Sequence, residues 1–420
     1  MSTATLTQLA IHGGPKAKTT PYTTGKRYLD NELAYLKDAL EQNSLFYANP
    51  KAKWVKRACE MMKTYTGMPY AFMVTSGSAA VHLGLIAAGI GPGDEVILSP
   101  NTDTGTAMGI IEEGAVPVFA DPEFTMQLSV DSIAKRITPR TKAVIVVHLA
   151  GEPAPIDKIV EFCHAKGIKV IEDCAQSWGA KLHGKPVGSF ADAGCYSTND
   201  YKHISTGDGG FIVVRDETTF RRVANYGDKH YDRLFGGSQY QQHHGVNYRV
   251  SELLGAVCVA QLEKVDQITS RQHDIGDRLR GLLKGLPGGR MAPQSEGAYS
   301  SYWWSMLLVD VEKMSVGRDE LIKAIQAEGV GVDSSQRYDL VQFDLYKKRV
   351  VRPWLPEPLN QYPFTQPDGR EYHYSIDDLP RQKQIMATGI RININTFYSD
   401  QDVDETAAGI WKVFEAYAKA

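Results

Sequence analysis

Short apolar runs alternate with longer segments of helical spacing between Tyr70 and Val214, and this alternation constrains the fold more than any other feature. The runs predicted to be buried strands are 71–74, 95–98, 116–120, 143–147, 169–171 and 211–214. The segments predicted to be covering helices are 79–88, 104–113 and 156–166. Because strands that alternate with helices pack as a mostly parallel sheet covered by helices, the sequence predicts an α/β protein.

Two domains are expected from the segments that flank this block. Further helical patterns lie at 30–43, 51–66 and 251–280. Residues 286–297 are rich in Gly and Pro, so we predict a large α/β domain with a helical entry over 1–285 and a smaller α+β domain over 286–420. The elements expected in the smaller domain are 301–309, 318–328, 389–395 and 401–417. Residues 338–376 lack periodicity but hold too many aromatic residues for a flexible linker, which predicts an ordered excursion.

The composition excludes several classes of partner. Lys plus Arg number 46 and Asp plus Glu 49, a formal net charge of -3 without the basic footprint of a nucleic-acid-binding protein. No uncharged apolar stretch is long enough to cross a bilayer, and the N-terminus does not resemble a secretion signal. The five cysteines form no CxxC pair, so we expect a cytoplasmic protein. No metal site is expected, because the adjacent His243 and His244 lack further ligands at fixed spacing.

The first candidate motif joins a strand end to a helix start. Ser76, Gly77 and Ser78 form the turn between the expected strand 71–74 and the expected helix 79–88. The free N–H groups and hydroxyls of such a turn can surround an anion, which the helix dipole also attracts. An ordinary N-capped helix is the alternative for this segment taken alone, since serine is a common cap.

The second candidate motif is a pair of carboxylates, Glu172 and Asp173, directly after the expected strand 169–171. Ligands of open α/β sheets bind at the carboxyl ends of the strands, where these side chains are expected to lie. A capping role for Asp173 is equally compatible with the sequence.

The third motif places one lysine in a turn rich in hydroxyl, amide and glycine residues. Lys202 lies within 195–210, directly before the expected strand 211–214. Alone it would be a solvated surface lysine, but its order after an anion-binding turn and a strand-end carboxylate suits pyridoxal phosphate (PLP) chemistry. A lysine amine forms a Schiff base with that cofactor, a carboxylate keeps its pyridine nitrogen protonated, and the turn holds its phosphate.

In this order, the motifs resemble those of the DegT/DnrJ/StrS family of PLP-dependent sugar and aminocyclitol aminotransferases, which have fold type I. The resemblance runs from about Ala10 to about Val265. The matching segments are 76–80 with the family's Ser-Gly-Thr-Ala-Ala, 172–176 with Glu-Asp-x-Ala-Gln, 202–210 with Lys-x-Leu-x-x-Gly-Glu-Gly-Gly, and 245–252 with Gly-x-Asn-x-Arg-x-Ser-Glu. The resemblance also implies a homodimer with shared active sites.

The resemblance implies roles for individual residues. Asp173 would pair with the pyridine nitrogen, Gln176 would contact the phenolic oxygen of the ring, and Lys202 would carry the cofactor. The implied phosphate contacts are Ser76, Gly77, Ser78, Ser197 and, from the neighbouring subunit, Asn247.

Some positions depart from the family pattern or bear on the substrate. Thr104 stands where many members place an aromatic ring against the cofactor, so a hydroxyl would face the ring instead. Glu152 replaces the more usual Gln or His and would put a carboxylate near the entrance. Lys202 is intact and followed by His203, whereas relatives with His in place of the lysine are sugar dehydratases. The expected substrate contacts are Glu152, His203 and Arg249, the last for the donor carboxylate.

The resemblance therefore implies an aminotransferase that moves an amino group from L-glutamine or L-glutamate to a keto sugar, a keto cyclitol or a related small polar ketone. Its expected place is the biosynthesis of antibiotics, other secondary metabolites or cell-surface sugars. A dehydratase or oxidative enzyme on the same scaffold is the first alternative, motivated by Thr104, Glu152 and an unusual C-terminal region. A non-catalytic PLP-binding regulator is the second, which the complete lysine motif disfavours.

Overall fold

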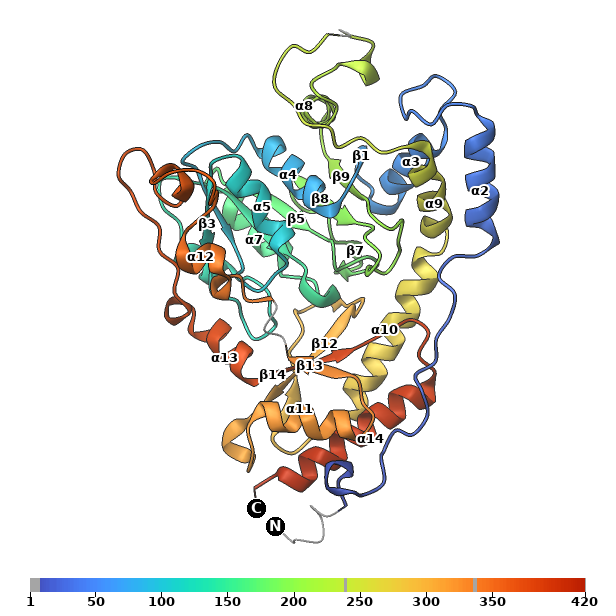
Figure 1. Cartoon of the computed structure of the whole chain (residues 1–420), viewed down its shortest axis with the longest axis vertical. Coiled ribbons are helices and arrows are strands. Elements are labelled where there is room, and N and C mark those ends of the chain that lie inside the picture. Colours follow the sequence, from blue (N-terminus) through green and yellow to red (C-terminus); the bar gives the residue numbers. More distant parts are fainter. Residues whose placement is uncertain (1–7, 238–239, 335–337, 420) are drawn as a thin grey trace.

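The computed structural model describes residues 8–237, 240–334 and 338–419 (Figure 1). Its largest sheet has seven strands in the order β1-β9-β8-β5-β4-β2-β3. These are β1 (Tyr70–Val74), β2 (Glu95–Leu98), β3 (Val116–Phe119), β4 (Thr141–Val147), β5 (Lys169–Asp173), β8 (Ala193–Ser197) and β9 (Gly210–Val214). Only β9 runs against its neighbours, so the predicted α/β class and mostly parallel sheet are confirmed.

Helices cover both faces of this sheet. Alternate residues of β4 point to opposite faces: Ala143 and Ile145 join one apolar cluster, and Val144 and Val146 join another. The helices of the first face are α4 (Gly77–Ala88), α5 (Thr104–Glu112) and α8 (Glu217–Gly227). Those of the second face are α7 (Ile156–His164), α3 (Trp54–Thr66) and α9 (Glu252–Leu262), with α2 (Asp30–Glu41) outside them. Burial on both faces explains why these strands are continuous apolar runs.

The structure differs from the predicted elements in two places. β8, in the middle of the sheet, was not predicted, because its sequence Ala-Gly-Cys-Tyr-Ser carries no β-branched residue. The helix expected over 251–280 is two helices, α9 and α10 (Val265–Leu282). α9 packs against α3 on one face of the large sheet, whereas α10 packs against α14 (Asp400–Tyr417) in the core of the smaller sheet. The break between α9 and α10 therefore lets each helix pack against a different sheet.

A second sheet of four antiparallel strands lies below the first in Figure 1. Its strands, in spatial order, are β10 (Gly289–Met291), β12 (Trp304–Val309), β14 (Gly389–Asn393) and β13 (Val332–Ser334). Its apolar core includes residues of α10, α11 (Arg318–Ala327) and α14. The remaining short elements are α6 (Val130–Ala134), α12 (Asp344–Lys348), α13 (Pro380–Thr388), β6 (Lys181–Leu182), β7 (Lys185–Pro186) and β11 (Ala298–Tyr299).

Two segments cross the division proposed between residues 285 and 286. Near the N-terminus, Leu9 is buried in the core of the second sheet, and the Nζ atom of Lys18 lies 2.6 Å from Oδ1 of Asp402. In the other direction, Leu340 and Phe364 are buried in the core of the first sheet. The unit around each sheet therefore contains chain from both sides of the proposed division.

The excursion expected over 338–376 is built around aromatic residues. Tyr346, Phe364 and Tyr374 pack with Phe119 of β3, with ring centroids between 5.1 and 5.7 Å apart. The hydroxyl of Tyr374 donates to the carbonyl of Pro117 at 2.9 Å. The segment thereby covers the β3 edge of the large sheet, which would otherwise expose unpaired backbone groups.

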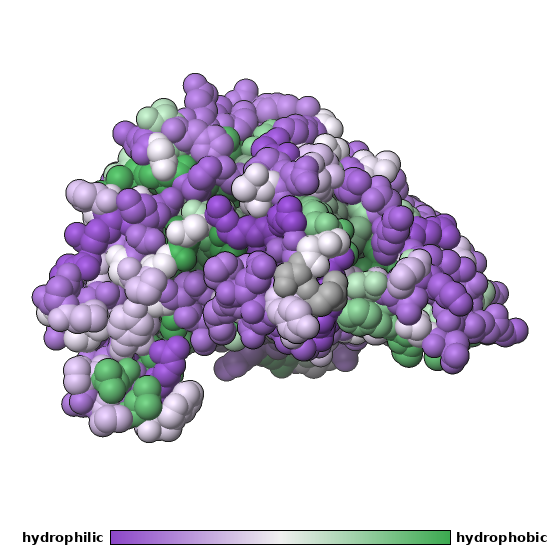
Figure 2. Space-filling view, turned by 90° about the horizontal axis from the view of Figure 1, so that it is seen from above, coloured by the Kyte–Doolittle hydropathy of each residue, from purple (hydrophilic) through white to green (hydrophobic). Residues whose placement is uncertain are grey.

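The surface of the molecule is mainly hydrophilic where Figure 2 displays it, and apolar residues appear there in small separate groups. Within the described residues, no helix combines the length and the apolar character that crossing a bilayer requires.

Candidate active site

A cavity of about 220 Å³ lies at the carboxyl-terminal edge of the large sheet. Its walls are the turn after β1, the start of α5, the ends of β5 and β8, and the loop after β8. Ligands of α/β sheets bind at this edge, because strand ends and helix N-termini meet there. The predicted site residues that line the cavity are Ser76, Gly77, Ser78, Asp173, Gln176, Ser197 and Lys202.

The turn before α4 is both a helix cap and a wall of the cavity. The Ser76 hydroxyl accepts a hydrogen bond from the N–H of Ala79 at 3.0 Å, which is an N-cap. The next N–H groups, of Gly77 and Ser78, belong to the first turn of a helix and have no intrahelical acceptor. A Cβ at Gly77 would lie 2.6 Å from Cβ of Ser197, so only glycine lets α4 approach β8 this closely. The result is a narrow cradle whose free N–H groups are able to donate hydrogen bonds to an anion.

We expect Gly77→Ala to lower the free energy of unfolding by about 1–3 kcal/mol, because the added methyl group overpacks this contact. Gly281→Ala is the matched control, since a Cβ at this helical glycine would meet nothing within 4 Å. That change should stabilise the protein by about 0.5–1 kcal/mol. Urea denaturation measures both variants, and equal effects would contradict the close approach of Gly77 to Ser197.

Asp173 is a buried carboxylate at the end of β5. Its Oδ2 accepts a hydrogen bond from the Thr106 hydroxyl at 2.7 Å, and its Oδ1 accepts one from the N–H of Ala175 at 3.0 Å. Burial raises the pKa of Asp173, while these two hydrogen bonds and the charge of Lys202 act in the opposite direction. A cationic group bound beside this carboxylate would offset the cost of its burial.

Lys202 lies in the loop after β8, half-buried, with its amine in the cavity. Its Nζ atom stands 4.1 Å from the centroid of the Trp303 ring. Burial lowers the pKa of Lys202, whereas the charges of Asp103 and Asp173 oppose that shift. A lowered pKa increases the fraction of neutral amine, which is the nucleophilic form.

Gln176 and Ser197 are two further predicted site residues that line the cavity. The Gln176 Oε1 atom accepts a hydrogen bond from the N–H of Ala150 at 3.0 Å, which fixes its amide against the wall. The Ser197 hydroxyl accepts one from the N–H of Asn199 at 3.2 Å. Both side chains are buried and face the same space as Lys202.

Three predicted residues lie outside the cavity of this chain. Thr104 is exposed on the first turn of α5 and does not line the cavity. Asn247 is exposed. The Nη1 atom of Arg249 donates to Oδ1 of Asp228 at 2.6 Å, so that its guanidinium is engaged within the chain. The expected contacts of Asn247 across a dimer and of Arg249 with a donor stay predictions.

Glu152 and His203 are buried, and they do not line the cavity either. The Glu152 carboxylate accepts hydrogen bonds from the N–H of Ser295 at 2.8 Å and from Nε2 of Gln294 at 3.2 Å. Burial raises the pKa of Glu152 to about 7. The Nε2 atom of His203 lies 3.2 Å from the carbonyl oxygen of Ser301, and burial lowers the pKa of His203 to about 4. Both residues therefore contact the segment before β12, whereas Glu152 was expected near the entrance and His203 in contact with the substrate.

Glu152 should make stability pH-dependent. Its pKa of about 7 in the folded protein exceeds the ordinary value of 4.5, so the folded state holds the proton more tightly. The free energy of unfolding should therefore fall by about 2–3 kcal/mol as the pH rises from 4.5 through 7. Glu152→Gln should flatten this dependence, whereas Glu296→Gln, at an exposed site, should not. Urea denaturation at pH 5 and pH 8 measures it, and an unchanged pH dependence in Glu152→Gln would contradict the assignment.

Sequence reasoning missed the cavity residues that α5 supplies. Asp103 caps this helix by accepting a hydrogen bond from the N–H of Gly105 at 2.9 Å, and it lines the cavity. Thr106 lies one turn further and donates to Asp173. The available signal was an Asp directly before the expected helix 104–113, a common capping position.

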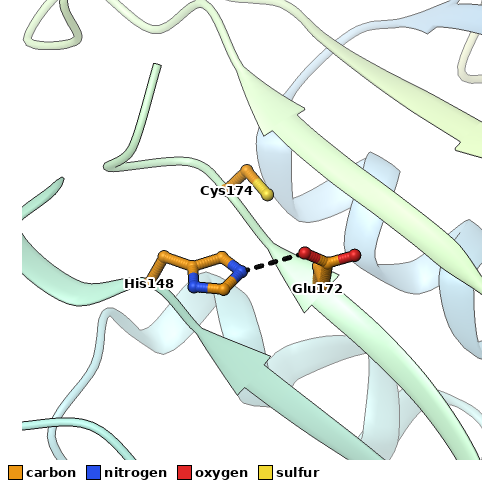
Figure 3. A group of neighbouring side chains, drawn as sticks. All are labelled: His148, Glu172 and Cys174. Atoms are coloured by element: carbon orange, nitrogen blue, oxygen red, sulfur yellow. Dashed lines mark hydrogen bonds and ion pairs between the residues drawn. The ribbon is translucent and has the colours of Figure 1, made fainter. Parts of the chain in front are cut away.

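His148, Glu172 and Cys174 form a buried group next to Asp173 along the chain (Figure 3). Nδ1 of His148 accepts a hydrogen bond from the N–H of Ala154 at 3.0 Å, so the ring hydrogen lies on Nε2, which is 3.1 Å from Glu172 Oε2. The same carboxylate accepts hydrogen bonds from the N–H groups of Gly188, Phe190 and Ala191. With both ring nitrogens and the carboxylate engaged, this group is a structural network and not a metal site.

Comparison with known proteins connects this geometry to a family. The model of the DegT/DnrJ/EryC1/StrS aminotransferase family matches residues 29–356. GDP-perosamine synthase of Escherichia coli O157:H7 is 30% identical over 388 residues, 91% of this chain and 98% of that protein. GDP-perosamine synthase of Vibrio cholerae is 32% identical over 297 residues, 70% of this chain and 79% of that protein.

Solved structures show the same fold. 3-Amino-5-hydroxybenzoic acid synthase superimposes with a TM-score of 0.81 at 22% identity, covering 94% of this chain and 99% of that one. Spr1654 of Streptococcus pneumoniae, described as a sugar aminotransferase in its PLP form, superimposes with a TM-score of 0.78 at 20% identity, covering 95% and 99%. The large α/β sheet and the smaller sheet thus form the fold type I of PLP-dependent aminotransferases. The chain belongs to the DegT/DnrJ/EryC1/StrS aminotransferase family.

Proposed function

We propose that this protein is a PLP-dependent enzyme that transfers an amino group from L-glutamine or L-glutamate to a keto sugar, a keto cyclitol or a related small polar ketone. The observation that carries the proposal is the convergence of Lys202, Asp173 and the helix cradle at Gly77 on one cavity. These three groups come from distant parts of the chain, and each suits a different part of the cofactor. The relatives support the acceptor class, since they include GDP-perosamine synthases and proteins named as L-glutamine-dependent aminocyclitol aminotransferases.

The charged and hydrogen-bonding groups of the cavity suit the cofactor. The cradle that glycine leaves open against β8 would hold the phosphate through its N–H groups and the hydroxyls of Ser76, Ser78 and Ser197. Asp173 would accept a hydrogen bond from the protonated pyridine nitrogen, and Gln176 would contact the phenolic oxygen. When bound, the cofactor supplies an electron sink for the carbon that bears the amino group.

Lys202 would have two tasks in this cavity. Its amine, made more nucleophilic by burial, would attach to the aldehyde carbon of the cofactor. When an amino donor displaces it, the freed amine would take the proton from the α-carbon of the donor as a general base. The Trp303 ring, at 4.1 Å, excludes water on one side of this amine.

A homodimer and a cytoplasmic location are part of the proposal. Asn247 and Arg249 lie outside the cavity of their own chain, and Asn247 is exposed. That position leaves Asn247 free to reach the phosphate in a second copy, as the family resemblance implies. The expected setting is the biosynthesis of secondary metabolites or cell-surface sugars.

The proposal is tested with the purified, PLP-loaded protein and two sets of substrates. L-glutamine and L-glutamate are offered separately, each with a 4-keto nucleotide sugar or a keto cyclitol, and mass spectrometry follows both products. We expect one aminated product to accumulate in equal amount with the 2-oxo acid. A 2-oxo acid formed without an aminated acceptor would favour the non-transaminating alternative, and no reaction with any donor would contradict the proposal.

A further inference from the structure

Both ring nitrogens of His82, a buried residue of α4, have a partner within hydrogen-bond distance. His82 is 5% exposed, and its Nε2 atom lies 2.6 Å from Oε1 of Glu113, directly after α5. Its Nδ1 atom lies 2.7 Å from the hydroxyl of Tyr248. A Cβ at Gly109 of α5 would lie 3.0 Å from Cβ of His82. The close approach of α5 to α4 therefore holds this histidine in place.

The charge of Glu113 sets the direction of these hydrogen bonds. Burial alone would raise the pKa of Glu113, but the hydrogen bonds from His82 and Tyr226 hold that pKa below its ordinary value. The charged carboxylate therefore accepts from Nε2 of His82 and, at 3.1 Å, from the hydroxyl of Tyr226. With Nε2 as the donor, Nδ1 of the neutral ring is an acceptor, so the Tyr248 hydroxyl donates to it.

Tyr248 lies within the segment 245–249, which is joined to two other parts of the chain through the backbone of this tyrosine. The N–H of Tyr248 donates to the carbonyl of Gly227, at the end of α8, at 2.8 Å. The carbonyl of Tyr248 accepts a hydrogen bond from the N–H of Thr75 at 3.1 Å. Thr75 directly precedes the turn that forms the cradle of the cavity. His82 therefore holds a segment that also contacts the cradle.

The neighbouring Asn247 is turned the other way. Asn247 is exposed, and it forms an isolated β-bridge with Asp228, so the backbone is extended at this point. Successive side chains of an extended segment point to opposite sides. The hydrogen bond that holds Tyr248 against His82 therefore also fixes the direction in which Asn247 points, away from its own chain.

We propose that His82 is a positioning residue, which holds Asn247 through the Tyr248 hydroxyl so that Asn247 is placed for the cofactor phosphate in a second copy of the chain. The proposal rests on the proposed function, which assigns Asn247 to that phosphate. His82 does not line the cavity of its own chain. Loss of its ring should therefore weaken cofactor binding in the other subunit and leave binding in its own subunit nearly unchanged.

Mixed dimers test this prediction, because they separate the two subunits. One chain carries Lys202→Ala, so the absorbance band of lysine-bound cofactor comes only from the cavity of the other chain, the reporting cavity. Two affinity tags purify each mixed dimer, and titration with PLP gives the Kd of the reporting cavity. With His82→Leu on the Lys202→Ala chain, this Kd should rise about 5–10-fold. With His82→Leu on the reporting chain, it should change by about twofold or less.

Asn247→Ala on the Lys202→Ala chain gives the scale of the effect. If Asn247→Ala raises the Kd and His82→Leu on the same chain does not, the role of His82 is refuted. If neither raises it, the contact of Asn247 across the dimer is refuted as well. A rise that is equal or larger with His82→Leu on the reporting chain would show that His82 supports its own cradle, which overturns the proposal. The Kd requires no amino transfer, so inactivity with every donor would contradict the proposed function alone.

A milder variant guards against a His82→Leu chain that does not fold. Tyr248→Phe removes one hydroxyl from a half-buried ring, and on the Lys202→Ala chain it should also raise the Kd of the reporting cavity. An unchanged Kd would contradict the action of His82 through that hydroxyl. His164→Leu is the matched control, because His164 of α7 also lies 2.9 Å from a carboxylate, that of Asp192, on the opposite face of the large sheet. It should leave the Kd unchanged on either chain.

Discussion

Lys202→Ala should lower kcat for amino transfer by at least about 10⁴-fold. The variant loses the amine that would attach to the cofactor and the base that would move the proton of the donor. The variant should still fold, because Lys202 is only half-buried and the contact that is lost is the one between its amine and the Trp303 ring. Steady-state kinetics with L-glutamate and a keto acceptor measure the loss, and circular dichroism checks the fold.

The matched control for this variant is Lys166→Ala. Lys166 is an exposed lysine after α7 that does not line the cavity, so its removal should leave kcat unchanged. Turnover of Lys202→Ala within tenfold of the unmodified protein would refute the role assigned to this residue.

Asp173→Asn should slow the donor half-reaction by about 10³-fold. The asparagine keeps the size of the side chain, and its amide can still bond the Thr106 hydroxyl and the N–H of Ala175. The negative charge that would keep the pyridine nitrogen protonated is lost, so the electron sink weakens. Because burial raises the pKa of Asp173, removing the charge should not lower the free energy of unfolding. Stopped-flow single turnovers measure the rate, and urea denaturation measures the stability.

Asp103→Asn provides the comparison within the same cavity. Asn is as good a helix cap as Asp, so this change removes the charge that Asp103 places near Lys202 and keeps the cap. We expect a loss of about tenfold or less. Equal rates in Asp173→Asn and the unmodified protein would contradict the role of Asp173, as would an Asp103→Asn loss as large as that of Asp173→Asn.

Much of the large sheet could be predicted because burial on both faces leaves a continuous apolar signal. The expected strand 95–98 coincides with β2, and the expected 211–214 differs from β9 by one residue. Asp173 and the turn at Gly77 were predicted to lie at strand ends, and Lys202 was predicted to lie in the turn before the expected strand 211–214. Parallel strands bring such ends to one edge, so local motifs were enough to predict a shared cavity.

The rest of the site depends on contacts that local patterns do not carry. Successive helical residues point in directions that differ by about 100°, so the rotation of α5 against the sheet decides which of its side chains face the cavity. Here Asp103 and Thr106 line the cavity, and Thr104 does not. Trp303 lies against the amine of Lys202, and no sequence spacing connects two residues so far apart along the chain.

The central claim is that Lys202 and Asp173 hold PLP and use it for amino transfer. The most direct test is the visible absorbance spectrum of the purified protein before and after L-glutamate or L-glutamine is added. We predict the band of a lysine-bound cofactor, absent from Lys202→Ala, and its conversion to the band of the aminated cofactor when the donor is added. A cofactor band that no amino donor changes, or no bound cofactor at all, would contradict the account.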